Sequence, residues 1–174
     1  MADRVEAYAD GMLAVAQADG NLAAVSDELF RFARALESND ELRTTLSDPH
    51  LPASRRQQIV EDLLGGRADD KTTALVSMAV GAGRGRDLPA IIDNLVARAA
   101  SSKSLAVAEV RSAIELTDDQ RSRLADAIKK ATGKTVEVKV VVDPSVLGGI
   151  VTTVGDTVID GSVRTRLEQM KQAF

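Results

Sequence analysis

Few residues in this sequence have the types and spacing that acid–base, nucleophilic or metal chemistry requires. His50 is the single histidine and follows Pro49 in a predicted loop, so a Ser–His–Asp triad would have to use it. No GxSxG nucleophile elbow occurs. The paired carboxylates fall at predicted helix starts or exposed helical faces, where the helix dipole and solvation account for them; these pairs are Glu61-Asp62, Asp69-Asp70 and Asp118-Asp119. The sequence therefore predicts no catalytic residue and no metal ligand.

The segment GAGRGR, residues 81–86, is the one candidate for a phosphate-binding loop. It has arginine at position 86, where the dinucleotide fingerprint needs glycine, and it follows a predicted helix instead of a strand. No GxxxxGK[ST] sequence occurs elsewhere. We interpret the segment as a helix C-cap followed by a turn, and we expect no cofactor.

Composition excludes several further classes of protein. The 174 residues include no cysteine, which rules out disulfides, zinc–thiolate sites and thiol catalysis. The formal net charge of −4 and the aromatic content of 2% argue against a nucleic-acid binder, which needs a clustered positive surface. A basic patch for an acidic partner or lipid head groups remains open beside the interpretation as a solvated face; it would comprise Lys129, Lys130, Lys134, Arg164 and Arg166.

The sequence has no uninterrupted apolar run near the roughly 20 residues that span a bilayer. Its first ten residues, MADRVEAYAD, lack the apolar centre of a signal peptide and the Arg/Ser-rich character of a transit peptide. A bacterial cytoplasmic location is the resulting expectation.

The first hundred residues predict six helices separated by short breakers. Gly20 is predicted to end the first helix and Asn21 to cap the second, while Pro49 follows the third. The fifth is expected to place Leu75, Met78, Ala79 and Ala82 on one face. The sixth is expected to begin at Asp87 and to bury Leu88, Ile91, Ile92, Leu95, Val96 and Ala99.

The first helix carries an apolar stripe that is wider than its core contacts require. Val5, Tyr8, Ala9, Met12, Leu13 and Ala16 recur at intervals of three and four residues. Tyr8, Met12 and Val15 extend this stripe around the helix. Packing in the core of the bundle is the default interpretation of such a stripe, and its width also makes it a candidate for binding a partner helix in a groove.

After Ser101-Ser102 the pattern becomes mixed. A strand is predicted over 105–112, then a helix that opens with the capping box Thr117–Gln120 and buries Leu124, Ala127, Ile128 and Ala131. Alternating valines predict a second strand over 136–142, which completes a parallel βαβ unit. A hairpin turn at Gly155-Asp156 follows, and Ser162 is expected to cap a terminal helix.

These elements predict an α+β chain with two domains. Residues 1–103 are expected to form a six-helix bundle. Residues 104–174 are expected to form a small unit of βαβ, β-hairpin and terminal helix.

Residues 142–167, VDPSVLGGIVTTVGDTVIDGSVRTRL, resemble the C-terminal signature of the delta subunit of rotary ATP synthases, the family of the oligomycin-sensitivity-conferring protein. Weaker likeness extends over nearly the whole chain. The matching elements are Asp143-Pro144, Gly148-Gly149, Gly155-Asp156, Val158-Ile159-Asp160-Gly161-Ser162 and Leu167; the weaker ones are Tyr8-Ala9, Leu46-Ser47-Asp48-Pro49 and VAEVRSAIEL, which ends at Leu116.

This resemblance implies a non-catalytic connector in the peripheral stalk of a proton-translocating ATP synthase. Its helical domain would hold N-terminal helices of alpha subunits, and its C-terminal domain would hold the b-type stalk. The complex would place the chain on the cytoplasmic face of the bacterial cell membrane. Some relatives carry the delta region fused to a b-like stalk segment, so this chain could be a piece of such a protein.

The resemblance also implies roles for particular residues. The groove for the alpha helix would comprise Tyr8, Ala9, Met12, Met78 and Ala79. The stalk contact would comprise Val163, Leu167 and Met170. Gly148, Gly149, Gly155, Asp156, Asp160 and Gly161 would form structural turns.

Two alternatives come from other classes of function. A small enzyme would need a convergent polar site, which the sequence does not show. A cytoplasmic protein-binding adaptor unrelated to ATP synthase is compatible with the predicted architecture.

Overall fold

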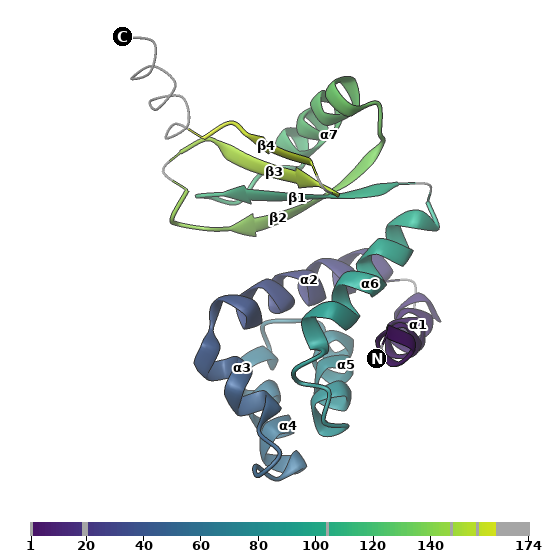
Figure 1. Ribbon diagram of the computed structural model, residues 1–174, viewed down its shortest axis with the longest axis vertical. Helices are drawn as coiled ribbons and strands as arrows, with labels where there is room; N and C mark the ends of the chain where they lie inside the picture. Colours follow the sequence, from purple (N-terminus) through teal and green to yellow (C-terminus); the bar gives the residue numbers. More distant parts are fainter. Residues whose placement is uncertain (1, 19–20, 104, 147, 156, 163–174) are drawn as a thin grey trace. The chain divides into compact units, whose positions relative to one another are not determined.

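The computed structural model describes residues 2–18, 21–103, 105–146, 148–155 and 157–162, with side chains from Arg4 onward. The chain separates into two compact units, Met1–Ala99 and Ala100–Phe174. The first unit is helical and the second contains a sheet and a helix (Figure 1). The fold is therefore a mixture of helix and strand, as predicted. The unit boundary lies four residues before the predicted domain boundary.

The described part of the first unit contains six helices. Their order and number agree with the periodicity of the sequence. They are α1 (Ala2–Ala18), α2 (Leu22–Ser38), α3 (Asp40–Ser47), α4 (Ala53–Leu64), α5 (Asp70–Gly81) and α6 (Leu88–Ser101).

An aliphatic core holds these helices together. In α6 the predicted buried face is confirmed, since Leu88, Ile91, Ile92, Leu95, Val96 and Ala99 are all at most 5% exposed. In α5 the predicted face was partly wrong, because Met78 and Ala82 are exposed. The buried stripe of α5 is rotated from the predicted one and comprises Thr72, Leu75, Val76, Ala79 and Val80.

Polar side chains at the helix starts bond both to neighbours in the sequence and to residues far along the chain. Asn39 accepts a hydrogen bond from the Leu42 N–H at 3.0 Å and caps α3. Asn21 precedes α2 as predicted, but its side chain makes no capping bond. Its Nδ2 donates instead to the Asp69 carboxylate at 3.0 Å. Asp69 in turn caps α5 by accepting from the Lys71 N–H at 2.9 Å.

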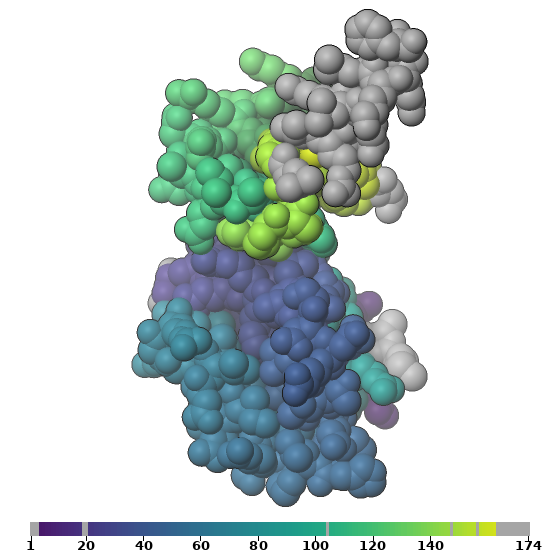
Figure 2. Space-filling view, turned by 90° about the vertical axis from the view of Figure 1, so that its left-hand side faces the viewer, coloured from purple at the N-terminus to yellow at the C-terminus, as the bar shows by residue number. Residues whose placement is uncertain are grey.

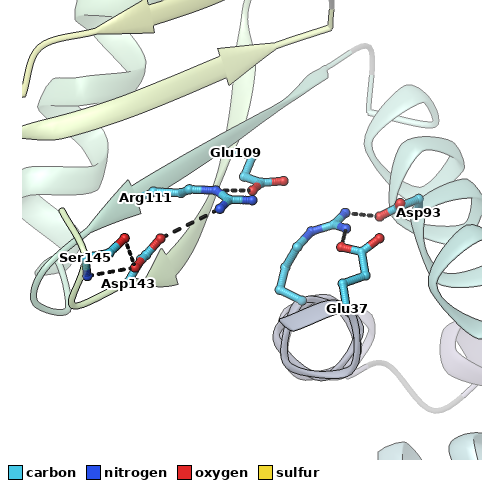
Figure 3. A network of polar contacts seen from close by, with 7 residues as sticks. Glu37, Asp93, Glu109, Arg111, Asp143 and Ser145 are labelled. Atoms are coloured by element: carbon cyan, nitrogen blue, oxygen red, sulfur yellow. Dashed lines mark hydrogen bonds and ion pairs between the residues drawn. The ribbon is translucent and has the colours of Figure 1, made fainter. Parts of the chain in front are cut away.

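Ion pairs fix two of the helix contacts. Arg34 of α2 donates to Glu37 and to Asp93 of α6 (Figure 3). Its guanidinium lies 4.7 Å from the Phe30 ring centroid. Arg98 of α6 pairs with Glu6 at 3.1 Å and Asp10 at 2.7 Å on α1. These contacts orient α1 and α2 against α6.

The second unit is built on a four-stranded sheet. Its elements are β1 (Ala106–Ser112), α7 (Asp118–Thr132), β2 (Val136–Val142), β3 (Ile150–Val154) and β4 (Thr157–Asp160). The strand order is β2-β1-β3-β4, with β1 parallel to β2 and antiparallel to β3. The predicted βαβ unit and the β3–β4 hairpin are thus confirmed.

Helix α7 covers one face of this sheet (Figure 1). Its capping box is formed as predicted, and Gly133 ends it with a φ of 73°. The core beneath it contains Ala108, Ile128, Val136 and Val154, with Leu124 and Ala125 packed against them. The prediction that Ala127 and Ala131 point inward was wrong, because both are exposed. Ala125 takes the inward position, since it lies three residues before Ile128.

Candidate functional site

The five residues predicted to line a groove on the helical unit differ in accessibility. Ala9, Met12 and Ala79 are fully buried at 0% exposure, so these three residues do not line an open groove. Tyr8 is half-buried and Met78 is 48% exposed. The apolar stripe of α1 therefore belongs largely to the unit's own core, and of the five predicted residues only Tyr8 and Met78 are accessible.

A surface along α1 remains available beside that core. Val15 is 49% exposed, and it lies seven residues from Tyr8 and hence on the same helical face. The Tyr8 ring lies 5.5 Å from the Arg84 guanidinium, in the loop that follows α5. Sequence periodicity did not indicate this contact, because it joins residues that are distant in the chain. It places the Tyr8 face of α1 next to the C-terminal end of α5.

Met78 lies close to α4. It lines an open depression between α4 and α5, together with Gln57, Glu61 and Ser77. The structure thus brings Tyr8 to the α5–α6 loop and Met78 to α4.

Three of the glycines predicted to form turns in the second unit have positive φ. Gly148 and Gly149 have φ values of 85° and 78°, and Gly155 in the hairpin has 57°. A Cβ on Gly149 would lie 2.5 Å from the Gly161 carbonyl oxygen, and the Gly161 N–H donates to the Ile150 carbonyl at 2.9 Å. The Asp160 carboxylate accepts from the Ser162 N–H at 2.8 Å. Asp156 and the predicted stalk contacts Val163, Leu167 and Met170 lie outside the described residues.

Asp143 organises the loop between β2 and β3 (Figure 3). Its carboxylate accepts from the Ser145 hydroxyl at 2.6 Å and from the Ser145 N–H at 2.9 Å. Arg111 of β1 lies 3.7 Å away and also pairs with Glu109 at 3.0 Å. The Ser145 hydroxyl and N–H, aided by the Arg111 charge, hold the pKa of Asp143 below its usual 3.8 against the opposing effect of burial.

We expect Asp143→Asn to lower the free energy of unfolding by about 1 kcal/mol at pH 7. Because the folded state depresses the pKa of Asp143, its charge stabilises the fold above the unfolded-state value, and that contribution is lost as pH falls through the folded-state value. Urea unfolding measured between pH 7 and pH 3 should show the two proteins converging below about pH 3.8. A constant difference over this range would contradict the assignment.

No group of three or more His, Cys, Asp or Glu side chains suited to a metal ion occurs among the described residues. Among the same residues, no helix is both long enough and apolar enough to span a bilayer.

Sequence comparison relates both units to known proteins. The model of the family described as ATP synthase delta (OSCP) subunit matches residues 5–174. The chain is 42% identical over 170 residues to ATP synthase subunit delta of Streptomyces griseus, a match that covers 97% of this chain. The chain belongs to the ATP synthase delta (OSCP) subunit family. This result gives no support to an adaptor unrelated to ATP synthase.

Other members of the delta (OSCP) family give similar matches. The Nocardia farcinica ATP synthase subunit delta is 42% identical over 163 residues, 94% of this chain. The chain spans 63% of the length of the Streptomyces griseus relative and 60% of the Nocardia farcinica one. A chain in a structure of the Toxoplasma gondii mitochondrial ATP synthase hexamer shares the fold, with a TM-score of 0.54 at 19% identity, covering 97% of this chain and 96% of that one.

Proposed function

We propose that this chain is a non-catalytic connector in the peripheral stalk of a proton-translocating ATP synthase. It links alpha subunits of the catalytic head to the b-type stalk, so that proton flow drives ATP synthesis. The observation that carries the proposal is the match of the delta (OSCP) family model over residues 5–174, which includes both units. In this role the chain lies peripherally on the cytoplasmic face of the bacterial membrane and supplies no catalytic group.

The helical unit binds an N-terminal helix of an alpha subunit along α1 and α5. Tyr8 and Val15 provide an accessible apolar face on α1, and Met78 is 48% exposed on α5. Ala9, Met12 and Ala79 are fully buried, so they would support this surface from within the core of the unit and would not touch the bound helix. An amphipathic helix laid on such a face contacts it through residues spaced by three, four and seven.

The second unit binds the b-type stalk through its C-terminal part, in which Val163, Leu167 and Met170 share one predicted helical face. Joining two binding units in one chain gives avidity. Once one unit is bound, the other meets its partner at an effective concentration of roughly millimolar order. A stationary connector needs slow dissociation, and two linked contacts provide it.

We expect Val15→Asp to weaken binding of an alpha-subunit N-terminal peptide at least about tenfold while the chain stays folded. The substitution places a carboxylate on a surface that the peptide must desolvate. Isothermal titration calorimetry of the full chain measures the affinity, and circular dichroism confirms the fold.

Leu63→Asp is the matched control, because Leu63 is 37% exposed on α4 and takes no part in the proposed surface. It should bind the peptide normally. Equal loss in both variants, or full affinity in a folded Val15→Asp protein, would refute the surface on α1.

A further inference from the structure

Arg56 of α4 is a buried cation for which the described residues supply no counter-charge. The residue is 8% exposed, and its guanidinium makes one hydrogen bond, in which Nη1 donates to the Asp48 carbonyl oxygen at 2.7 Å. Its Nε–H is buried without a partner, and no carboxylate in the described part of the chain pairs with it. A buried charge without a counter-charge is strongly unfavourable. An anion that reached this guanidinium would remove that cost.

Ser47, the last residue of α3, places a second unused polar group close to Arg56. Its hydroxyl is buried and makes no hydrogen bond with any residue that the structure describes. Ser47 directly precedes Asp48, whose carbonyl oxygen accepts the bond from Arg56. Both groups therefore belong to the junction at the end of α3. Figure 2 shows one face of the helical unit, in which α2, α3 and α4 appear in blue and teal.

Arg84, in the loop between α5 and α6, brings a third group to this junction. A Cβ on Gly85 would lie 2.2 Å from the Leu46 carbonyl oxygen and 3.2 Å from the Ser47 backbone nitrogen. The absence of a side chain at Gly85 therefore lets the loop touch the end of α3. The Arg84 Nε–H is buried and has no partner among the described residues, although Nη1 lies 3.6 Å from the Asp87 carboxylate.

The chemistry of these three groups indicates the charge and the shape of a ligand that would satisfy them. Two guanidinium groups and a hydroxyl can all donate hydrogen bonds, so the ligand carries oxygen acceptors and negative charge. The donors come from three elements, which are the end of α3, the first turn of α4 and the α5–α6 loop. One guanidinium is enough to match a planar carboxylate, whereas the four oxygens of a phosphate can accept from several sides.

We propose that Ser47, Arg56 and Arg84 form a binding site for a small oxyanion of the phosphate class. Arg56 supplies the buried charge, and the other two residues supply a hydroxyl and a second guanidinium. The segment GAGRGR takes part through the side chain of Arg84, without a glycine-rich backbone cradle. The bound anion joins the α3–α4 and α5–α6 loops, so its binding stabilises the helical unit. The site is independent of the proposed connector role.

Thermal unfolding of the full chain tests the site with inorganic phosphate as the probe. At about 20 mM phosphate, we expect the melting temperature to rise by at least about 3 °C over that in chloride of equal ionic strength. Sodium acetate at the same ionic strength should raise it by less than about 1 °C. No rise with phosphate, or an equal rise with acetate, would overturn the proposal.

Arg56→Met separates a bound anion from the general stabilisation that phosphate gives to folded proteins. Phosphate is excluded from protein surfaces and so strengthens burial in any protein, and this general effect persists in the variant. We expect the variant to lose the rest of the response. In chloride it should melt no lower than the parent, because the Asp48 carbonyl oxygen keeps the Leu51 N–H bond at 3.3 Å. An equal lowering in chloride and in phosphate would assign Arg56 a structural role and refute the site.

Arg55→Gln is the matched control, because Arg55 is the exposed neighbour of Arg56 and donates to Gln58. It should keep the full phosphate response. Ser47→Ala should weaken phosphate binding about fivefold in calorimetry without lowering the melting temperature in chloride, since its hydroxyl has no partner among the described residues. Equal loss of response in Arg55→Gln and Arg56→Met would show general attraction to positive charge and contradict the site.

Discussion

We expect Ala9→Asp to abolish cooperative folding of the helical unit at 37 °C. Ala9 has no exposed surface, so the new carboxylate would enter an aliphatic core without a partner. The cost is roughly 4 kcal/mol, which is a large fraction of the stability of an ordinary domain. Thermal unfolding followed by circular dichroism measures the effect.

Ala7→Asp is the matched control, because Ala7 lies two residues away on the exposed side of the same helix. It should change the free energy of unfolding by less than about 0.5 kcal/mol. This prediction replaces the expectation from sequence that position 9 lines an open groove. A folded Ala9→Asp protein that had lost only its partner binding would restore that earlier interpretation.

A second large effect is expected for Gly149→Ala, which should lower the stability of the sheet-containing unit by about 3 kcal/mol. Two costs combine at this position. The φ of 78° is unfavourable for any residue with a Cβ. The added Cβ would also lie 2.5 Å from the Gly161 carbonyl oxygen and 2.8 Å from the Ser162 Cα, both on the backbone that follows β4.

Gly133→Ala separates the two costs. Gly133 has a φ of 73° at the end of α7, and a Cβ there would meet nothing within 4 Å. We expect a loss of about 1 kcal/mol in this control. Urea unfolding of both variants gives the comparison. Similar losses at the two positions would show that contact with Gly161 carries no energetic weight.

Much of the fold was predictable because local signals agree with the packing. The period of 3.6 in α6 and the capping box of α7 are satisfied by residues close in sequence, and the structure contains both. Alternation in β2 and the Gly155 turn likewise fixed the strands of the second unit. Each of these features depends on residues within about twelve positions of one another in the sequence.

The accessible surfaces were less predictable, since they depend on which helices become neighbours. Periodicity grouped Met78 with Leu75 and Ala79, but packing against α4 and the core left Met78 exposed. The contact of Tyr8 with Arg84 and the role of Asn21 toward Asp69 join positions far apart in the chain. The resemblance in residues 142–167 identified the family, yet it did not separate core side chains from surface ones.

The pairing of β4 bears on how this unit would carry mechanical load. β4 lies at the edge of the sheet, and its four residues pair with Val151 to Val154 of β3. The Gly161 N–H bond to Ile150 secures the point at which the chain leaves the strand. Tension applied there along the strand axis would act on all the β3–β4 hydrogen bonds in shear, while tension across the sheet would break them one by one. In the proposed connector role, the unit should therefore resist load best when the pull is parallel to β4.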